Sequence, residues 1–162
     1  MLKLRLLSDA DVPVVESWLN SEHVKKFFDV PGVCSIDEWM YEIKNREGDF
    51  QFLTHLIAAW DDYPIGFCQY YKCADSDEDW GALPLEGAYC IDYLIGEKSY
   101  LGKGLGKEIL AKLVERIFSL PNAACVVGDI DTDNKISEKT LLASGFTLFD
   151  ANHNRYILHK PS

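Results

Sequence analysis

The sequence lacks an excess of positive charge and any long hydrophobic run. Its 16 lysines and arginines stand against 26 aspartates and glutamates, which gives a net charge of −10. Domains that bind nucleic acid are usually basic, so this balance argues against a nucleic-acid partner. No apolar run approaches the roughly 20 residues that cross a bilayer, so no membrane partner is expected either.

Disulfide and metal-binding patterns are also missing. The cysteines are odd in number and form no C-x-x-C pair, which fits reduced thiols buried in strands; they are Cys34, Cys68, Cys73, Cys90 and Cys125. The four histidines show no spacing such as H-x-x-x-H, so no metal is expected. The N-terminus alternates apolar and basic residues as a strand does, unlike a signal peptide, and we expect a cytoplasmic location.

What the chain does contain is a glycine-rich turn between an apolar strand and a helix. Gly102, Gly104 and Gly106 follow residues 91–95 and open a helix expected over residues 107–118. Backbone N–H groups and the positive end of the helix dipole would suit a pyrophosphate there. Glu108 follows Lys107, so the Gly-Lys-Ser/Thr of a Walker loop is absent, and the spacing is not that of a dinucleotide fingerprint. A ligand-free turn is the alternative interpretation.

Acidic residues gather in the irregular stretch 73–87, around Trp80. A solvated surface loop is the ordinary interpretation of such a run. The functional interpretation is an anionic wall with one aromatic platform, which would suit a cationic ligand. The acids are Asp75, Asp77, Glu78, Asp79 and Glu86. The glycine turn is a local exception to the acidity, because Lys98, Lys103 and Lys107 cluster there.

One further acid, Asp92, stands inside the strand expected at residues 88–95. Period-two alternation places it on the same face as Cys90 and Leu94. A carboxylate among apolar neighbours is unfavourable unless it is paired or opens onto a cavity. An ordinary edge-facing aspartate is the alternative.

The 162 residues are expected to form one domain with the element order β-α-α-β-β-β-α-β-α-β-β. Residues 21–28 are expected as a short helical turn, and residues 35–48 as a capped helix. This order predicts an α/β (α+β) fold, with a mixed, twisted sheet and helices on both faces.

The element order and several motifs together resemble the GNAT N-acetyltransferase superfamily, and within it the aminoglycoside 6′-N-acetyltransferases. The resemblance spans nearly the whole chain, and the glycine loop is its most specific part. Its residues include Trp18, Leu19, Asn20, His23, Phe27, Phe28, the run 64–67, Ile91, Asp92, the loop 101–106, Asn134, Ser137, Gly145 and Phe146. The resemblance implies a mostly antiparallel GNAT sheet with a central splay between two strands.

The resemblance also implies roles for particular residues. Acetyl-CoA would be held by Tyr93, Leu94, Ile95, Leu101, Gly102, Lys103, Gly104, Leu105, Gly106, Lys107 and Asn134. Asp92 would be the catalytic carboxylate beside the acceptor amine. The substrate wall would include Trp18, Phe27, Phe28, Asp79, Trp80, Glu86 and Asp92. The implied reaction is acetyl transfer to a primary amine of a cationic small molecule, most simply the 6′-amine of an aminoglycoside.

Two positions depart from the family pattern. Leu101 stands where the loop often begins with Gln or Arg, and Leu141 stands where many members carry a general-acid tyrosine. The alternatives are acetylation of another amine, such as a polyamine, a siderophore precursor or a protein N-terminus, or a non-catalytic module that binds coenzyme A. The sequence allows a monomer or a homodimer.

Overall fold

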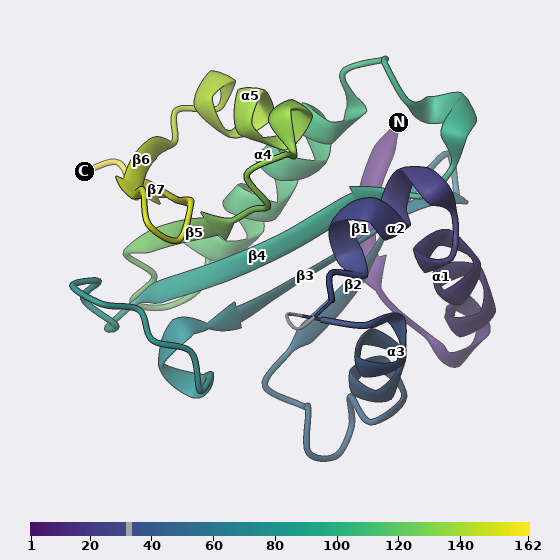
Figure 1. Ribbon diagram of the computed structural model, residues 1–162, viewed down its shortest axis with the longest axis horizontal. Helices are drawn as coiled ribbons and strands as arrows, with labels where there is room; N and C mark the ends of the chain where they lie inside the picture. Colours follow the sequence, from purple (N-terminus) through teal and green to yellow (C-terminus); the bar gives the residue numbers. More distant parts are fainter. Residues whose placement is uncertain (32–33) are drawn as a thin grey trace. The chain divides into compact units, whose positions relative to one another are not determined.

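The computed structural model describes residues 1–31 and 34–162 (Figure 1). Its seven strands are ordered β1-β2-β3-β4-β5-β7-β6 in one sheet. The β4–β5 pair is parallel, whereas β1–β2, β5–β7 and β6–β7 are antiparallel. The predicted mixed, mostly antiparallel sheet is therefore confirmed. Two compact units make up the chain: residues 1–69 with 93–105 form unit 1, and residues 70–92 with 106–162 form unit 2.

Unit 1 contains the first three strands and three helices. Its elements are β1 (Leu2–Leu6), α1 (Val12–Leu19), α2 (Glu22–Phe28), α3 (Ile36–Lys44), β2 (Thr54–Trp60) and the first part of β3 (Tyr63–Lys72). Ser35 caps α3 by accepting a hydrogen bond from the Glu38 N–H at 3.2 Å. The segment expected as a short helical turn forms the complete helix α2, so the number of helices before β2 is three rather than two.

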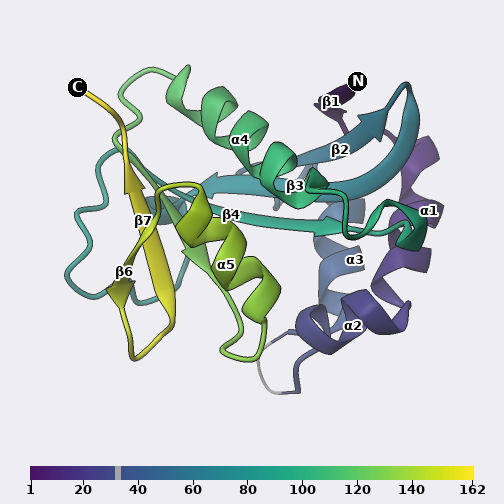
Figure 2. The same ribbon diagram turned by 90° about the horizontal axis from the view of Figure 1, so that it is seen from above.

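The three helices of unit 1 lie on the same side of β2 and β3 (Figure 2). Trp18 and Leu19 of α1 and Met40 and Ile43 of α3 are buried there. They pack in one cluster with Val24, Ile57, Phe67 and Leu94. Apolar residues at helical spacing therefore form the buried face of α1 and of α3.

Unit 2 contains the remaining strands and two helices. Its elements are the first part of β4 (Ala88–Ile95), α4 (Leu105–Phe118), β5 (Cys125–Asp129), α5 (Lys135–Ala143), β6 (Thr147–Asp150) and β7 (Arg155–His159). Strand β4 has the bounds predicted from the sequence. Among the residues described, even α4, with 14 residues, is not long and apolar enough to cross a membrane.

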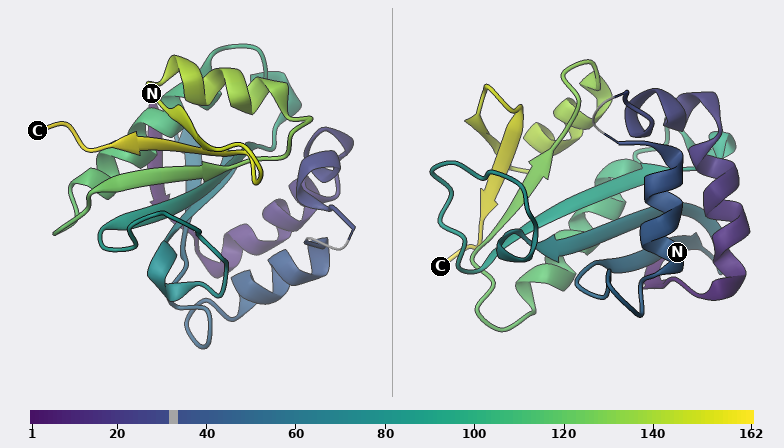
Figure 3. Two further views of the ribbon diagram at one scale, coloured as in Figure 1. Left: turned by 60° about the vertical axis from the view of Figure 1, so that its left-hand side comes forward. Right: turned by 60° about the horizontal axis from the view of Figure 1, so that its bottom comes forward.

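The strands of unit 2 are covered on both faces. Helices α4 and α5 lie on one face, and the segment that follows β3 lies on the other (Figure 3). Trp80 and Leu83 of that segment are buried against the strands. The cluster also includes Cys73, Ala88, Cys90, Cys125, Val127 and Ile157. The acidic stretch is therefore anchored by apolar side chains although its carboxylates are exposed.

The cysteines are free thiols, as the sequence predicts. Cys68, Cys73, Cys90 and Cys125 are buried, and Cys34 is partly exposed. Burial raises the pKa of the Cys73 thiol to about 12 and that of Cys90 well above its ordinary value. These buried thiols are therefore protonated at neutral pH and poor nucleophiles.

Two buried polar side chains in unit 1 give the fold a dependence on pH. The Asp11 carboxylate accepts hydrogen bonds from both Arg5 guanidinium nitrogens, at 2.7 and 2.8 Å, and these bonds lower its pKa to about 2. His55 is buried and stacked against Phe67, with ring centroids 5.9 Å apart. Burial, helped by the positive charge of Arg46, lowers the pKa of His55 to about 4. Neither ring nitrogen of His55 has a hydrogen-bond partner among the residues described.

We expect the free energy of unfolding to fall between about pH 6.5 and pH 4, because the unfolded chain binds a proton at His55 before the folded chain does. A second loss follows below about pH 4, as Asp11 is protonated more easily in the unfolded chain. Urea titrations at several pH values measure both effects. His55→Phe should abolish the first loss and leave the second, and an unaltered profile would contradict this assignment.

Candidate active site

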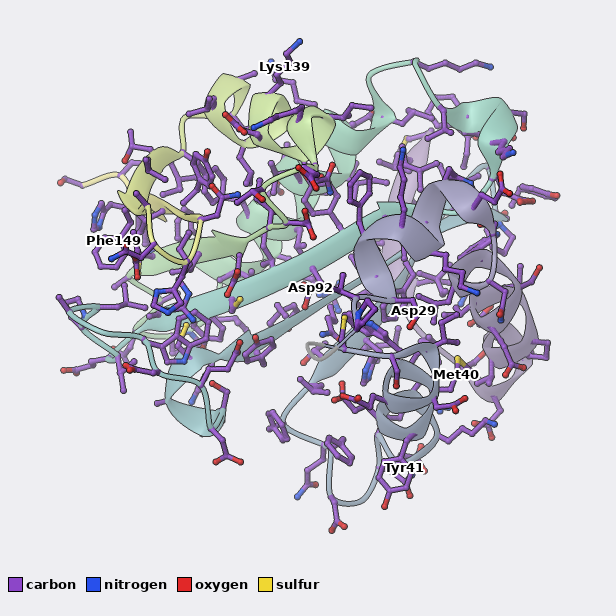
Figure 4. All side chains as sticks on the ribbon, in the orientation of Figure 1. Asp29, Met40, Tyr41, Asp92, Lys139 and Phe149 are labelled. Atoms are coloured by element: carbon purple, nitrogen blue, oxygen red, sulfur yellow. The ribbon has the colours of Figure 1, made fainter. Side chains whose placement is uncertain are left out.

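The parallel pairing of β4 with β5 ends before β4 does. The register runs from Ala88 opposite Cys125 to Ile91 opposite Gly128, whereas β4 continues to Ile95. Backbone groups of β4 beyond Ile91 are therefore outside that ladder. The ladder ends at the position where the sequence predicts a splay, and Asp92, labelled in Figure 4, is the first residue after the last paired position.

The end of β4, and the turn at Gly96 and Glu97 that follows it, are held within unit 1 by β3 and α2. The N–H groups of Gly96 and Glu97 both donate to the Ile65 carbonyl, at 2.8 and 3.2 Å. His23 Nε2 lies 3.0 Å from the Ile95 carbonyl, and because a carbonyl only accepts, this nitrogen carries the proton. His23 Nδ1 is buried and has no partner among the residues described. His23 thus fixes the last carbonyl of the strand expected to bind a cofactor.

Trp18, on α1, packs against this turn. It is only 3% exposed and packs against Gly96, where a Cβ atom would come within 2.1 Å of the indole ring. Its Nε1–H donates to Glu97 Oε2 at 3.2 Å, and the Tyr63 hydroxyl donates to Glu97 Oε1 at the same distance. The sequence predicts Trp18 in the substrate wall, and in the structure its buried side chain supports this turn.

The glycine loop follows directly. Gly102 and Gly104 have positive φ angles of 74° and 75°, and a Cβ atom at either would meet nothing within 4 Å. Helix α4 begins at Leu105, which is buried, two residues earlier than the sequence suggested. The loop therefore presents backbone rather than side chains, as a bound pyrophosphate requires. Leu101, Lys103 and Lys107 are exposed beside it, as is Lys98.

The two adjacent aromatic residues of α2, Phe27 and Phe28, lie in different environments. Phe28 packs against the core of unit 1, with its ring 5.4 Å from that of Trp39. Phe27 is half-buried, and the ammonium nitrogen of Lys26 lies 4.9 Å from its ring centre. One ring of the pair thus joins the core, as expected for neighbours that cannot share a helix face.

Asp92, in unit 2, is half-buried beside two groups that resist ionisation. Burial raises the pKa of the Cys90 thiol, and the negative charge of Asp92 raises it further. Burial and the same charge, together with Glu78, raise the pKa of Tyr71 above its ordinary range. The Tyr71 hydroxyl donates to Glu78 Oε2 at 2.8 Å. Burial is the larger cause of both shifts, and the negative charge of Asp92 adds to each in the same direction.

Trp80 is not the open platform that the sequence suggested. It is 4% exposed, and its Nε1–H donates to the Cys73 carbonyl at 3.1 Å and to Ser76 Oγ at 2.9 Å. The Arg155 guanidinium lies 4.4 Å from its ring centre. The sequence predicts an aromatic platform for a cationic ligand, and in the structure the chain's own cation covers the indole. Asp79 and Glu86, which flank it in sequence, are exposed.

Asp129 is a carboxylate that the sequence analysis did not select. It follows Gly128 on β5 as Asp92 follows Ile91 on β4, one step beyond the last paired position. Burial raises its pKa, while its hydrogen bond to Arg155 Nε, at 3.1 Å, acts in the opposite direction. The sequence signal that could have identified Asp129 is an acidic residue at the carboxyl end of each of two neighbouring parallel strands.

Asn134 and Leu141 both lie on α5 or at its start. The Asn134 carboxamide oxygen accepts the Ser137 N–H at 3.2 Å and so caps the helix. Leu141 is completely buried, and its methyl groups lie 3.1 and 3.2 Å from the position of a Cβ on Gly128. Leu141 therefore fills space against β5, and it offers no proton where many family members have a tyrosine.

The acetyltransferase (GNAT) domain family matches residues 8–152 of the sequence. The chain belongs to the GNAT acetyltransferase family. This GNAT chain is 28% identical over 149 residues to aminoglycoside N(6′)-acetyltransferase type 1 of Klebsiella pneumoniae, a match that covers 88% of the chain and 72% of that protein. It is 26% identical over 160 residues to the N-acetyltransferase YfmK of Bacillus subtilis, with 91% and 86% covered.

Solved structures share the fold of this GNAT protein. Aminoglycoside acetyltransferase AAC(6′)-Ib in complex with coenzyme A and kanamycin has a TM-score of 0.84 at 23% identity, over 99% of this chain and 95% of that one. The aminoglycoside N(6′)-acetyltransferase of Legionella pneumophila has a TM-score of 0.78 at 17% identity, over 98% and 91%. The family and fold predicted from the sequence are confirmed.

Proposed function

We propose that this GNAT protein transfers an acetyl group from acetyl-CoA to a primary amine of a cationic small molecule, with the 6′-amine of an aminoglycoside as the leading candidate. The observation that carries the proposal is the position of Asp92, a half-buried carboxylate where β4 leaves its parallel partner. The relatives named aminoglycoside N(6′)-acetyltransferases, at 28% identity, support the choice of acceptor.

The residues around the glycine loop fit acetyl-CoA. Positive φ angles at Gly102 and Gly104, with open space where Cβ atoms would lie, leave a cradle of backbone N–H groups for the pyrophosphate. Backbone groups of Tyr93, Leu94 and Ile95, beyond the β5 ladder, would bind the pantetheine arm as a neighbouring strand does. The amide of Asn134 would contact the cofactor as well.

Acetyl-CoA supplies an acyl group activated as a thioester. The chain must hold the acceptor amine and remove its proton, since an ammonium ion has no lone pair with which to attack. Asp92 would bind the ammonium, orient it and accept its proton directly or through water. Because an ordinary aspartate, with a pKa of about 3.9, is a weak base, positioning is expected to be the larger contribution of Asp92. Backbone N–H groups at the strand end would polarise the acyl carbonyl.

The leaving thiolate requires no tyrosine in this scheme. Leu141 is buried and cannot donate a proton. A thiol with a pKa near ~8.5 is acidic enough that its thiolate can leave without a dedicated general acid. The presence of Leu141, where many family members have a tyrosine, is therefore compatible with turnover.

The exposed acids of the stretch 73–87 also suit a polyamine, which is the second candidate acceptor. Asp75, Asp77, Glu78 and Asp79 are all exposed, and a field of this kind attracts any polycation by long-range steering.

The experiment measures release of the coenzyme A thiol from acetyl-CoA in parallel wells with kanamycin, spermidine and a short peptide. We expect turnover with kanamycin at a micromolar KM. Turnover only with spermidine or the peptide would keep the reaction and replace the acceptor. No turnover with any acceptor, alongside clear acetyl-CoA binding, would favour a non-catalytic coenzyme A-binding module over the proposal.

A further inference from the structure

Arg155, the first residue of β7, is a buried cation in unit 2. It is 4% exposed, and a guanidinium is removed from water only at a large energetic cost unless it is paired. Its Nε donates to Asp129 Oδ2 at 3.1 Å, and its Nη1 donates to the Asp79 carbonyl at 2.6 Å. A more distant carboxylate, Asp150 Oδ2, lies 4.0 Å from Nη1. The cation is thus surrounded by oxygen acceptors.

The fourth partner of Arg155 is the indole of Trp80, whose ring centre lies 4.4 Å from the guanidinium carbon. Trp80 is fixed in place by hydrogen bonds from its Nε1–H to Cys73 and Ser76. An aromatic face, a carboxylate and a carbonyl are the groups that bind an organic ammonium ion. Unit 2 therefore contains a formed cation site, and a side chain of the protein fills it.

An acceptor ammonium cannot use this site without displacing a covalently attached guanidinium. The effective concentration of an attached group is high, so displacement by a free ligand is unfavourable. Arg155 also compensates the charge of Asp129 and so weakens the negative field near the end of β5. Both effects act more strongly against ligands with several ammonium groups than against a monoamine.

We propose that Arg155 is a specificity-determining residue, an internal cation that lowers the preference of this acetyltransferase for polycationic acceptors relative to acceptors with one ammonium group. The inference rests on the proposed function and specifies how many ammonium groups the preferred acceptor carries. Arg155 acts through Asp129 and Trp80 rather than on the reacting atoms.

The test compares Arg155→Gln and Arg155→Met with the wild type, using kanamycin, spermidine and 2-phenylethylamine as acceptors. For each protein we would measure the ratio of the polycation KM to the monoamine KM. The two neutral variants should lower this ratio about three- to fivefold, the size of one partly screened charge pair. Arg155→Lys, which keeps the charge, is the matched control and should retain the wild-type ratio. Adding Asp129→Asn to Arg155→Gln should raise the ratio of the polycation KM to the monoamine KM back toward the wild-type value.

Calorimetric dissociation constants for the same three amines give a readout that does not need turnover. If no amine is acetylated, the proposed function fails, while the same three- to fivefold shift in the ratio of dissociation constants would still support the role of Arg155. If neither neutral variant folds, Asp129→Asn alone tests the effect of the Arg155 charge, because it removes the carboxylate that pairs with it. It leaves the guanidinium uncompensated, so the ratio should rise by a similar factor. A folded neutral variant whose polycation-to-monoamine ratio is unchanged or higher overturns the inference. An Asp129→Asn protein whose ratio is unchanged or lower overturns it as well.

Discussion

Replacing Asp92 by Asn is expected to lower kcat for acetyl transfer by at least about tenfold, because the carboxamide can neither pair with an ammonium ion nor accept its proton. Asp92 is half-buried where β4 leaves the β5 ladder, and its charge is felt by Cys90 and Tyr71. The variant keeps the size of the side chain. The measurement is the rate of thiol release at saturating acetyl-CoA, with the dissociation constant for acetyl-CoA determined separately.

The control for Asp92→Asn is Glu115→Gln, which removes one negative charge from an exposed position on α4. That variant separates a local effect from a change in net charge, and its kcat should match the wild type. If Asp92→Asn keeps near-normal turnover, Asp92 has no part in the reaction. A loss of acetyl-CoA binding in Asp92→Asn would instead point to a disturbed strand end.

Gly96→Ala is expected to lower the free energy of unfolding by about 3 kcal/mol, the upper part of the usual range for an overpacked core. The added Cβ would lie 2.1 Å from the Trp18 indole, which is itself buried and cannot swing aside into solvent. Urea unfolding measures the change. Because the Gly96 N–H holds the end of β4 to the Ile65 carbonyl, affinity for acetyl-CoA should fall as well.

Gly48→Ala is the matched control for Gly96→Ala. A Cβ at Gly48 would lie 3.7 Å from the Asn45 carbonyl oxygen, an ordinary van der Waals contact, so its effect should be small. A Gly96→Ala protein as stable as Gly48→Ala would mean that Trp18 can repack. The strand end would then be less rigid than its hydrogen bonds suggest.

Local sequence signals predicted much of the secondary structure. The apolar run at residues 88–95, interrupted only by Asp92, matches β4, and the alternating leucines match β1. Ser35 caps α3, as the prediction of a capped helix over residues 35–48 requires. These features depend on neighbours within about four residues, so a single sequence contains their determinants.

The errors in the fold prediction came from segments stabilised at long range. Residues 22–28 have a weak apolar period, yet Val24 is buried among α1, α3 and the strands, which stabilises α2 as a complete helix. The number of helices before β2 was therefore underestimated. Tertiary burial, rather than local propensity, decides a helix this short.

In the candidate site too, features with a local sequence signal were predicted, and features that depend on long-range contacts were not. The glycine loop and Asp92 were found because their residue types stand out against their local pattern. Trp18 and Trp80 were placed in a substrate wall, but both are buried by partners 75 or more positions away, as the bond from Trp18 to Glu97 and the stacking of Arg155 on Trp80 show. Asp129 was missed because its relation to Asp92 exists only through the register of β4 and β5.

The burial of the cysteines has a practical consequence for labelling and for colorimetric assays. Cys68, Cys73, Cys90 and Cys125 are inaccessible, and burial keeps the pKa of the last three above the ordinary value. A disulfide reagent added to the native protein would therefore react with little besides the partly exposed Cys34. The background signal should be at most one equivalent per chain. The same thiol offers a single attachment point for a fluorophore, next to α3.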